Sequence, residues 1–372
     1  MRSPIDIIKN IPPLKAIRRK LQKRRAEALR QLALDGGKMP LPRGLVFEPT
    51  QRCNLSCIMC CHRQHHTEGS CPEMDTGAAV EFIKELKKQH DFRTIGFIGS
   101  EPFVRTDLED LMKAAVGLGM DVSVQTNSTL LDEARIKTWS RHKSRIRSFG
   151  ASLEGVAGVD DRIRPGKDVF NRARRGIELA VQAGLPVTVS ILILDSNRER
   201  LGELIELLNA LRVRSMDLSL IVNHSRADIE ETARLSGMDE KDVCITSKPE
   251  LEYKTSADVL LDDLENGLAL GRSYSMSTST SPDSFLEHYR EIRDGSIRRK
   301  RQLTCGALDT IRIDPSGRLI HCQHLRRSFG DLRKVKLIEA WNSEEYRAFR
   351  KKLIKENLFP VCADCYRMRV LG

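Results

Sequence analysis

The sequence lacks any apolar run that approaches the ~20 residues of a membrane-spanning helix. Its N-terminus, Met-Arg-Ser-Pro, also lacks the apolar centre of a secretion signal. We therefore expect a cytoplasmic protein, with peripheral contact at a membrane surface as an alternative.

Most of the chain lacks net charge as well. Of the total of +11, residues 1–43 contribute +9, from twelve Lys and Arg against three acidic residues. Nucleic acid is therefore not the expected partner.

The basic segment is predicted to form a helix from Leu14 to Leu34, because it follows Pro12-Pro13 and is stopped by Gly36-Gly37. Its predicted apolar face consists of Leu14, Ile17, Leu21, Ala28 and Leu32. The other faces carry Arg18, Arg19, Lys20, Lys23, Arg24 and Arg25. Such a helix fits a solvated cap packed across the body of the protein, docking on an anionic membrane, or binding to an acidic partner or nucleic acid.

Three of the ten cysteines stand within eight residues, in Cys53-Asn-Leu-Ser-Cys57-Ile-Met-Cys60. In a chain without an export signal, such thiols are expected to bind metal or take part in redox chemistry rather than form disulfides. A structural zinc ion takes four ligands, whereas three thiolates can hold a [4Fe-4S] cluster and leave one iron open. A zinc site with a fourth ligand remains the alternative. Candidates for that ligand are Cys61, His62, His65 and Cys71.

The spacing Cys-x3-Cys-x2-Cys resembles the signature of the radical S-adenosylmethionine superfamily. The resemblance implies that the open iron binds the amino and carboxylate groups of S-adenosylmethionine. It also implies that reductive cleavage gives methionine and a 5′-deoxyadenosyl radical, which takes hydrogen from a substrate. An electron donor such as flavodoxin or ferredoxin is then expected. The neighbouring His62, His65 and His66 are expected to lie beyond the cluster, since a fourth protein ligand would block the open iron.

From Gly44 the chain alternates short apolar runs with helical patterns, which is typical of βαβ units. The predicted strands are residues 44–48, 94–98, 121–125, 147–154, 187–194 and 215–222. The predicted helices are residues 77–89, 107–118 with Asp107 as cap, 131–140, 170–183 and 198–211. These six repeats fit an α/β fold with a partial (β/α)6 barrel, which the resemblance also implies. Catalytic groups are then expected where the strands end.

The expected division is an N-terminal helix (1–43), the barrel (44–225), a bridging segment (226–300) and a C-terminal cluster domain (301–372). Within the bridge, residues 274–282 read as a polar loop, either a linker or a lid. Cys244 is expected to be a small buried hydrophobe.

Polar residues at the predicted strand ends suit S-adenosylmethionine. Gly99-Ser100-Glu101-Pro102 resembles the family's Gly-Gly-Glu-Pro motif, with Ser100 replacing the second glycine. The resemblance assigns Glu101 to the ammonium of the cofactor, through a charge-assisted hydrogen bond. Asn127 and Ser152 resemble positions that reach the ribose and carboxylate. Arg164 is assigned either to a carboxylate of cofactor or substrate or to a structural salt bridge. Met59 stands where the family has an aromatic residue near adenine.

A second set of four cysteines, Cys305, Cys322, Cys362 and Cys365, follows in the last third of the chain. The pattern Cys305, Gly317-x4-Cys322 and Cys362-x2-Cys365 resembles a SPASM domain, which carries auxiliary [4Fe-4S] clusters. Only seven residues follow Cys365 and none is a cysteine, so a shortened, twitch-like form with one four-thiolate cluster is expected. Residues 311–321 read as a hairpin and residues 334–354 as a helix. Structural zinc is the alternative here too.

The leading hypothesis is a radical S-adenosylmethionine enzyme that oxidises or modifies a small molecule, such as a sugar or aminocyclitol, or a peptide. A saturated second cluster favours electron transfer. No residue is assigned as general acid or base, although His321, His324 and Glu154 are candidates. One alternative is a membrane-peripheral enzyme of lipid modification. An alternative of another class is a zinc-stabilised nucleic-acid-binding protein.

Overall fold

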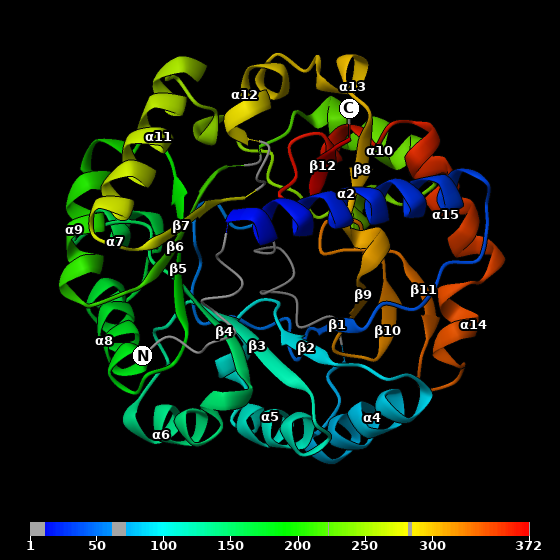
Figure 1. Cartoon of the computed structure of the whole chain (residues 1–372), viewed down its shortest axis with the longest axis horizontal. Helices are drawn as coiled ribbons and strands as arrows, with labels where there is room; N and C mark the ends of the chain where they lie inside the picture. The colour runs from blue at the N-terminus through cyan, green and yellow to red at the C-terminus, as the bar shows by residue number, and fades with distance from the viewer. Residues whose placement is uncertain (1–11, 62–71, 222, 282–284, 372) are drawn as a thin grey trace.

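A computed structural model describes residues 12–61, 72–221, 223–281 and 285–371. Seven parallel strands form the body of one curved sheet, and helices cover its outer side (Figure 1). The strands are β1 (Gly44–Phe47), β2 (Thr94–Phe97), β3 (Asp121–Thr126), β4 (Ile146–Ser152), β5 (Val187–Ile193), β6 (Ser215–Leu220) and β7 (Ser277–Thr280). The first six agree with the predicted strands within about two residues, although residue 222 lies outside the described part of the chain.

The covering helices alternate with the strands, as predicted. They are α4 (Thr76–Gln89), α5 (Leu108–Gly117), α6 (Glu133–Arg141), α8 (Val169–Gln182), α9 (Leu201–Ala210) and α11 (Ala257–Ser273). Their apolar sides pack on the sheet and form the main core, in which Phe97, Phe149 and Ile191 are fully buried. The prediction that Asp107 caps α5 is wrong in one respect. Its carboxylate accepts hydrogen bonds from the Arg105 guanidinium and makes no side-chain cap bond.

The predicted bridge differs most from the structure. The sequence predicts a polar loop over residues 274–282, but this segment contains β7, which pairs in parallel with β6. Alternating Ser and Thr suit an exposed edge strand, because β-branched threonines favour extended backbone. Helix α11 and strand β7 therefore continue the repeat past residue 225. The rest of the segment holds α10 (Arg226–Ser236), α12 (Phe285–Arg293) and α13 (Ile297–Lys300).

The C-terminal segment joins the same sheet. The predicted hairpin is present as β9 (Ile311–Ile313) and β10 (Arg318–Ile320), and β9 pairs in parallel with β1. The sheet is therefore open, with β11 (Ser328–Asp331) and β7 at its edges. A second small sheet pairs β8 (Leu303–Cys305) with β12 (Met368–Val370). The predicted helix over 334–354 is two helices, α14 (Leu337–Trp341) and α15 (Glu344–Lys355), because Ser343 caps α15.

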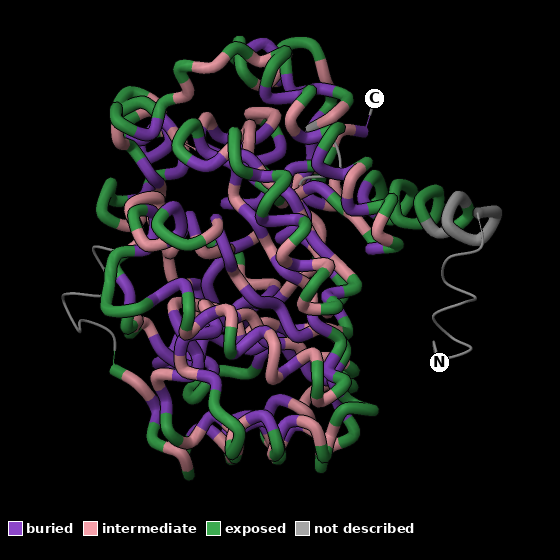
Figure 2. The backbone as a smooth tube through the Cα atoms, turned by 90° about the vertical axis from the view of Figure 1, so that its left-hand side faces the viewer, coloured by how far each residue is buried: buried purple, intermediate pink, exposed green. Residues whose placement is uncertain are grey.

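The N-terminal helix α2 (Pro12–Leu34) agrees with the predicted helix but packs through a different face. Ala26, Leu29 and Ala33 are buried next to α15 and the C-terminal segment, whereas Ile17 and Leu21 are 54% and 59% exposed. The buried contacts of α2 with the body come from its C-terminal half, and the helix projects from the body (Figure 2). No helix among the described residues is long and apolar enough to cross a membrane.

Candidate active site

The three-cysteine loop follows β1, at the edge of the sheet where the parallel strands end. Cys53, Cys57 and Cys60 are all half-buried. The loop is ordered by backbone hydrogen bonds, including Leu55 N–H to Cys53 Sγ (3.5 Å) and Cys60 N–H to the Cys57 carbonyl (3.2 Å). Burial raises the pKa of the Cys57 thiol to about 12, and the nearby Arg164 guanidinium opposes that shift. A thiolate at Cys57 therefore needs a bound cationic group, as a cluster iron would provide.

A closed zinc site would require four converging ligands. Within the described ranges, no three His, Cys, Asp or Glu side chains lie close enough together to hold a single metal ion. Of the proposed fourth ligands, His62, His65 and Cys71 lie outside the described residues, as does His66. Cys61 is described, and its sulfur lies 4.0 Å from His324 Nδ1. The described residues therefore supply no closed zinc site at this loop.

Glu101, after β2, is fully buried and organises the neighbouring strand end. Its Oε1 accepts hydrogen bonds from Phe103 N–H (3.0 Å) and the Thr126 hydroxyl (2.8 Å), and its Oε2 accepts from Asn127 N–H (2.6 Å). Burial raises the pKa of Glu101 to about 7, although these three donors pull it down. A carboxylate has about four acceptor positions, so one is left for a cofactor N–H. Glu101 therefore positions the Asn127 loop whether or not it touches the cofactor.

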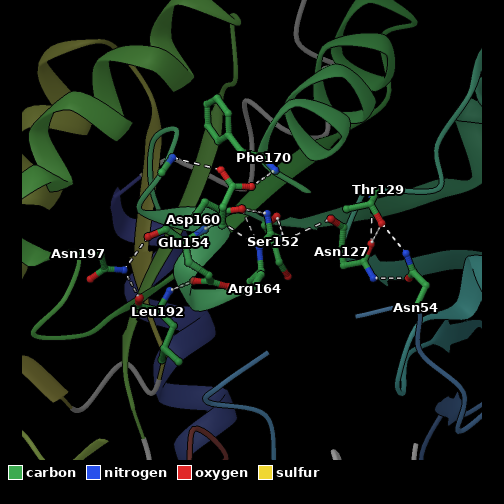
Figure 3. A network of polar contacts seen from close by, with 12 residues as sticks. Asn54, Asn127, Thr129, Ser152, Glu154, Asp160, Arg164, Phe170, Leu192 and Asn197 are labelled. Carbon is green, nitrogen blue, oxygen red and sulfur yellow. Dashed lines mark hydrogen bonds and ion pairs between the residues drawn. The ribbon is translucent and has the colours of Figure 1, made fainter. Parts of the chain in front are cut away.

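Asn127 extends this network to the cysteine loop. Its amide nitrogen donates to Asn54 Oδ1 (2.9 Å) and lies 3.9 Å from Cys53 Sγ, while Asn54 donates to the Thr129 hydroxyl (2.8 Å; Figure 3). Ser152, at the end of β4, accepts a hydrogen bond from Gln125 at its hydroxyl (3.2 Å). Asn127 therefore touches the cysteine loop, and Ser152 lies at the end of the adjacent strand.

The structure favours the structural alternative for Arg164. This buried guanidinium makes a two-pronged ion pair with Asp160 and donates to the carbonyls of Ser152 (2.9 Å) and Asn127 (3.3 Å; Figure 3). These contacts join the ends of β3 and β4, so Arg164 is a positioning residue. Ser100 is half-buried, and a Cβ on the preceding Gly99 would lie 3.2 Å from the Thr50 carbonyl, a tight contact that favours glycine there.

The four C-terminal cysteines come together from separate elements. Cys305 ends β8, Cys322 follows β10, Cys362 ends the 3-10 turn η7 (Pro360–Cys362), and Cys365 follows three residues later. Burial raises the pKa of Cys362 well above its usual range, and its three partner thiols raise it further. Backbone N–H groups reach Cys305 Sγ (3.3 Å), Cys322 Sγ (3.2 Å) and Cys365 Sγ (3.4 Å). Buried thiols with donors on the sulfurs suit an iron–sulfur cluster.

The three candidate acid–base residues have separate environments. His321 contacts the four-cysteine site, with Nε2 4.0 Å from Cys305 Sγ, and its Nδ1 lies 3.1 Å from the Tyr346 hydroxyl. Burial lowers the pKa of His321 to about 3, so it is neutral. Glu154 accepts from Leu192 N–H (2.6 Å), and burial raises its pKa to about 7. Of the three, only His324 lines the cavity described next.

A cavity of about 460 Å³ lies between the two cysteine sites. Met59 and Cys61 line it from the first site, and Gln323, Tyr366 and Arg367 line it from the second. Its wall includes apolar side chains from several strands, such as Ile98, Leu192 and Leu220. Buried clefts with a few polar groups are typical of small-molecule sites. The cavity is therefore the place where a substrate would meet groups from both cysteine sites.

Two functional features were missed from the sequence. Glu48, directly after β1, pairs with Arg312 of β9 (2.6 Å) and with Arg326 (2.8 Å), which fixes the C-terminal hairpin against the barrel. Arg105 ties the segments around the cysteine loop, through the carbonyls of Pro49 (3.1 Å) and Met74 (2.8 Å). A charged residue at the end of an apolar strand was the available signal for Glu48, but its partners lie more than 260 residues away.

Cysteine 244 is buried, as predicted, and its thiol donates to the Cys61 carbonyl (3.2 Å). This contact links the bridging segment to the first cysteine loop. It contributes no ligand to either cysteine set.

Comparison with known proteins agrees with this arrangement. Residues 47–208 match the model of the radical SAM superfamily, and residues 305–366 match SPASM, an iron-sulfur cluster-binding domain. Similar curated proteins include an AdoMet-dependent heme synthase from Oleidesulfovibrio alaskensis, 24% identical over 90% of this chain and 82% of that protein. Another is the PqqA peptide cyclase from Granulibacter bethesdensis, 24% identical over 88% of this chain and 81% of that protein.

Solved structures share the fold. SuiB of Streptococcus suis bound to S-adenosylmethionine has a TM-score of 0.62 at 14% identity, over 83% of this chain and 68% of that one. The enzyme anSMEcpe with bound AdoMet has a TM-score of 0.61 at 15% identity, over 83% of each chain. The zinc-stabilised nucleic-acid-binding alternative is therefore wrong at the level of family. The chain belongs to the radical SAM superfamily, as an enzyme that uses a [4Fe-4S] cluster and S-adenosylmethionine and carries an auxiliary SPASM-type iron–sulfur domain.

Proposed function

We propose that Cys53, Cys57 and Cys60 hold the cluster that cleaves S-adenosylmethionine, and that hydrogen is abstracted from a small molecule or peptide in the central cavity. When bound, the cluster and cofactor supply a 5′-deoxyadenosyl radical. The observation that carries this assignment is the position of the three-thiol loop, between the Glu101–Asn127 network and the 460 Å³ cavity. Reactive groups of such folds gather at this edge of the sheet.

The chain's own residues would orient the cofactor. Glu101 fixes the Asn127 backbone, and Asn127 reaches the cysteine loop, so the two residues set where polar groups of S-adenosylmethionine could bind. Arg164 holds the Ser152 and Asn127 carbonyls in place. Met59 and Leu192 give the cavity wall near the loop an apolar surface that keeps water from a radical intermediate.

Cys305, Cys322, Cys362 and Cys365 would hold one auxiliary cluster through four thiolates. Their mutual burial leaves the substrate to contact neighbouring residues, such as Tyr366 and His324, rather than the cluster itself. We assign this cluster to electron transfer, with a flavodoxin or ferredoxin as the external donor. A name among the relatives, PqqA peptide cyclase, supports a peptide as substrate, and another, heme synthase, supports a small molecule.

Anaerobic turnover with a chemical reductant tests the first assignment. The wild-type protein should form 5′-deoxyadenosine, and Cys57→Ala should reduce formation to the background of the metal-free protein, because one cluster ligand is lost. Cys244→Ser is the matched control, since Cys244 is a buried cysteine outside both sets and serine keeps a donor for the Cys61 carbonyl. Wild-type rates in Cys57→Ala would overturn the assignment.

A peripheral membrane role is a second candidate, because Ile17 and Leu21 are exposed on α2 beside the exposed Lys20 and Arg24. An amphipathic surface of this kind binds anionic membranes. Co-sedimentation with phosphatidylglycerol vesicles should fall when residues 1–24 are removed, which leaves the packed half of α2 intact. Equal sedimentation of both forms would reject this role.

A further inference from the structure

We propose that the central cavity binds its substrate through a carboxylate group held by Arg312. The proposal deepens the proposed function, because it names a chemical class for the substrate of the same site. Arg312 lies on β9, only 4% of its surface is exposed, and it lines the cavity between the two cysteine sites.

The hydrogen bonds of Arg312 leave part of its guanidinium without a partner. Its Nε donates to Glu48 Oε1 (2.6 Å), but its buried Nη2 has no hydrogen-bond partner among the described residues. Leaving a buried donor unpaired is costly, and native proteins seldom do so unless another group binds there. The planar guanidinium matches the two oxygens of a carboxylate.

The local charges also call for an anion. Glu48 is shared by two guanidiniums, because Arg326 Nη2 donates to its Oε2 (2.8 Å) as Arg312 donates to Oε1. Glu48 thus faces two guanidiniums, and the nearby carboxylate of Asp314 is itself paired with Arg318. Arg367 adds a further guanidinium to the cavity wall, where its charge also faces the thiols of Cys305, Cys322 and Cys365; its buried Nε has no hydrogen-bond partner among the described residues.

The remaining wall limits what the anion can be. Asp217 is the carboxylate in this lining, on β6, and it accepts a hydrogen bond from Ser279 (2.6 Å). A doubly charged phosphate would meet this opposing charge, whereas a single carboxylate on an apolar skeleton suits both Arg312 and the side chains of Ile98, Leu192 and Leu220. The geometry therefore favours a substrate with one carboxylate beside apolar atoms.

A second cavity, with a mostly basic lining, adjoins the central cavity. It measures about 660 Å³ and shares Ser281 and Tyr366 with the first. Its basic lining residues are Arg19, Lys23, Arg301 and Arg369, against one carboxylate, Glu287; of these, Arg301 is paired with Glu291 outside the lining. Positive charge along an approach raises the association rate of an anion.

Binding of 4-phenylbutyrate and its uncharged amide, 4-phenylbutyramide, tests the proposal without turnover. Both probes would be titrated by ligand-observed NMR into the reconstituted wild-type enzyme with S-adenosylmethionine. The acid should bind about 10-fold more tightly than the amide, as expected for hydrogen bonds to a charged group. Equal binding would overturn the proposal, while failure of 5′-deoxyadenosine formation would instead count against the proposed function.

Two matched variants locate the anion. Arg312→Lys should remove most of the roughly 10-fold preference for the acid, whereas Arg326→Lys, which alters the other partner of Glu48 outside the cavity lining, should keep it. Equal loss in both would show a structural effect and overturn the assignment to Arg312.

Asp217→Asn should strengthen binding of the acid severalfold by removing a like charge. No change in Asp217→Asn would place the probe elsewhere and also overturn the proposal, even if Arg312→Lys fails to fold.

Discussion

The two cysteine sites of this chain are built in different ways. Cys53, Cys57 and Cys60 stand on one half-buried loop, whereas Cys305, Cys322 and the pair Cys362 and Cys365 come from three separate segments, with Cys362 and Cys365 buried. The first site depends on a polar network from neighbouring strand ends, and the second is embedded in the core. The difference indicates a site that leaves room for a ligand and a site closed by its own thiols.

Removing one thiol from each site tests the difference between them most directly. Cys57→Ala and Cys362→Ala should each lower iron from about eight to about four atoms per chain, because each cubane holds four. Only Cys57→Ala should abolish 5′-deoxyadenosine formation, while Cys362→Ala should retain it and lose substrate oxidation. Iron analysis and chromatography of anaerobic reactions measure both effects. Loss of 5′-deoxyadenosine in a folded Cys362→Ala would remove the functional distinction.

The first site could be predicted largely from the sequence, because its chemistry is local. The three thiols lie within one loop, and Glu101, Asn127 and Ser152 each follow a recognisable apolar strand. The six strands and their helices were likewise predicted from local patterns. The direction of each side chain could not be predicted from the sequence. The ion pair between Arg164 and Asp160 is therefore known only from the structure.

Long-range strand pairings could not be predicted, because they depend on segments that lie far apart in the sequence. Strand β9 joins β1 across more than 260 residues, and no local pattern of Ile311–Ile313 distinguishes this pairing from an isolated hairpin. The polar β7 was read as a loop because its alternation of Ser and Thr has no apolar face. The predicted apolar face of α2 is wrong because the C-terminal segment covers Ala26, Leu29 and Ala33, and no local pattern in the helix shows where that segment packs.

The pH dependence of protein stability tests the environment of Glu101 beside the first cysteine site. Burial raises the folded-state pKa of Glu101 from 4.5 to about 7, so the folded protein binds this proton more tightly than the unfolded chain. Stability contributed by this group is therefore fully present below pH 4.5 and is lost as pH rises to about 7. Relative to Glu101→Gln, the wild-type protein should lose on the order of 3 kcal/mol between these limits. Denaturant unfolding at several pH values measures the difference, and a pH-independent difference would contradict the raised pKa.

Loss of the Glu101 carboxylate should also weaken cofactor binding. In Glu101→Gln, an amide N–H₂ replaces one oxygen that now accepts a hydrogen bond, so the Asn127 loop loses part of its support. We expect affinity for S-adenosylmethionine to fall about 10- to 100-fold, the range for hydrogen bonds to charged groups. Calorimetry on the reconstituted enzyme measures this affinity. Glu109→Gln, on the outer helix α5, is the control and should leave affinity unchanged.

The smallest effect is expected at the exposed Leu21 in the N-terminal half of α2. This position lies outside the core that surrounds the four-cysteine site. Leu21 is 59% exposed, so Leu21→Ser should change the free energy of unfolding by no more than about 0.5 kcal/mol. Leu29, eight residues later, is buried beside the C-terminal segment, so Leu29→Ala should cost about 2–5 kcal/mol. Denaturant unfolding of both variants makes the comparison. A cost at Leu21 similar to that at Leu29 would mean that the projecting half of α2 is covered in solution, because an exposed leucine has no packing to lose.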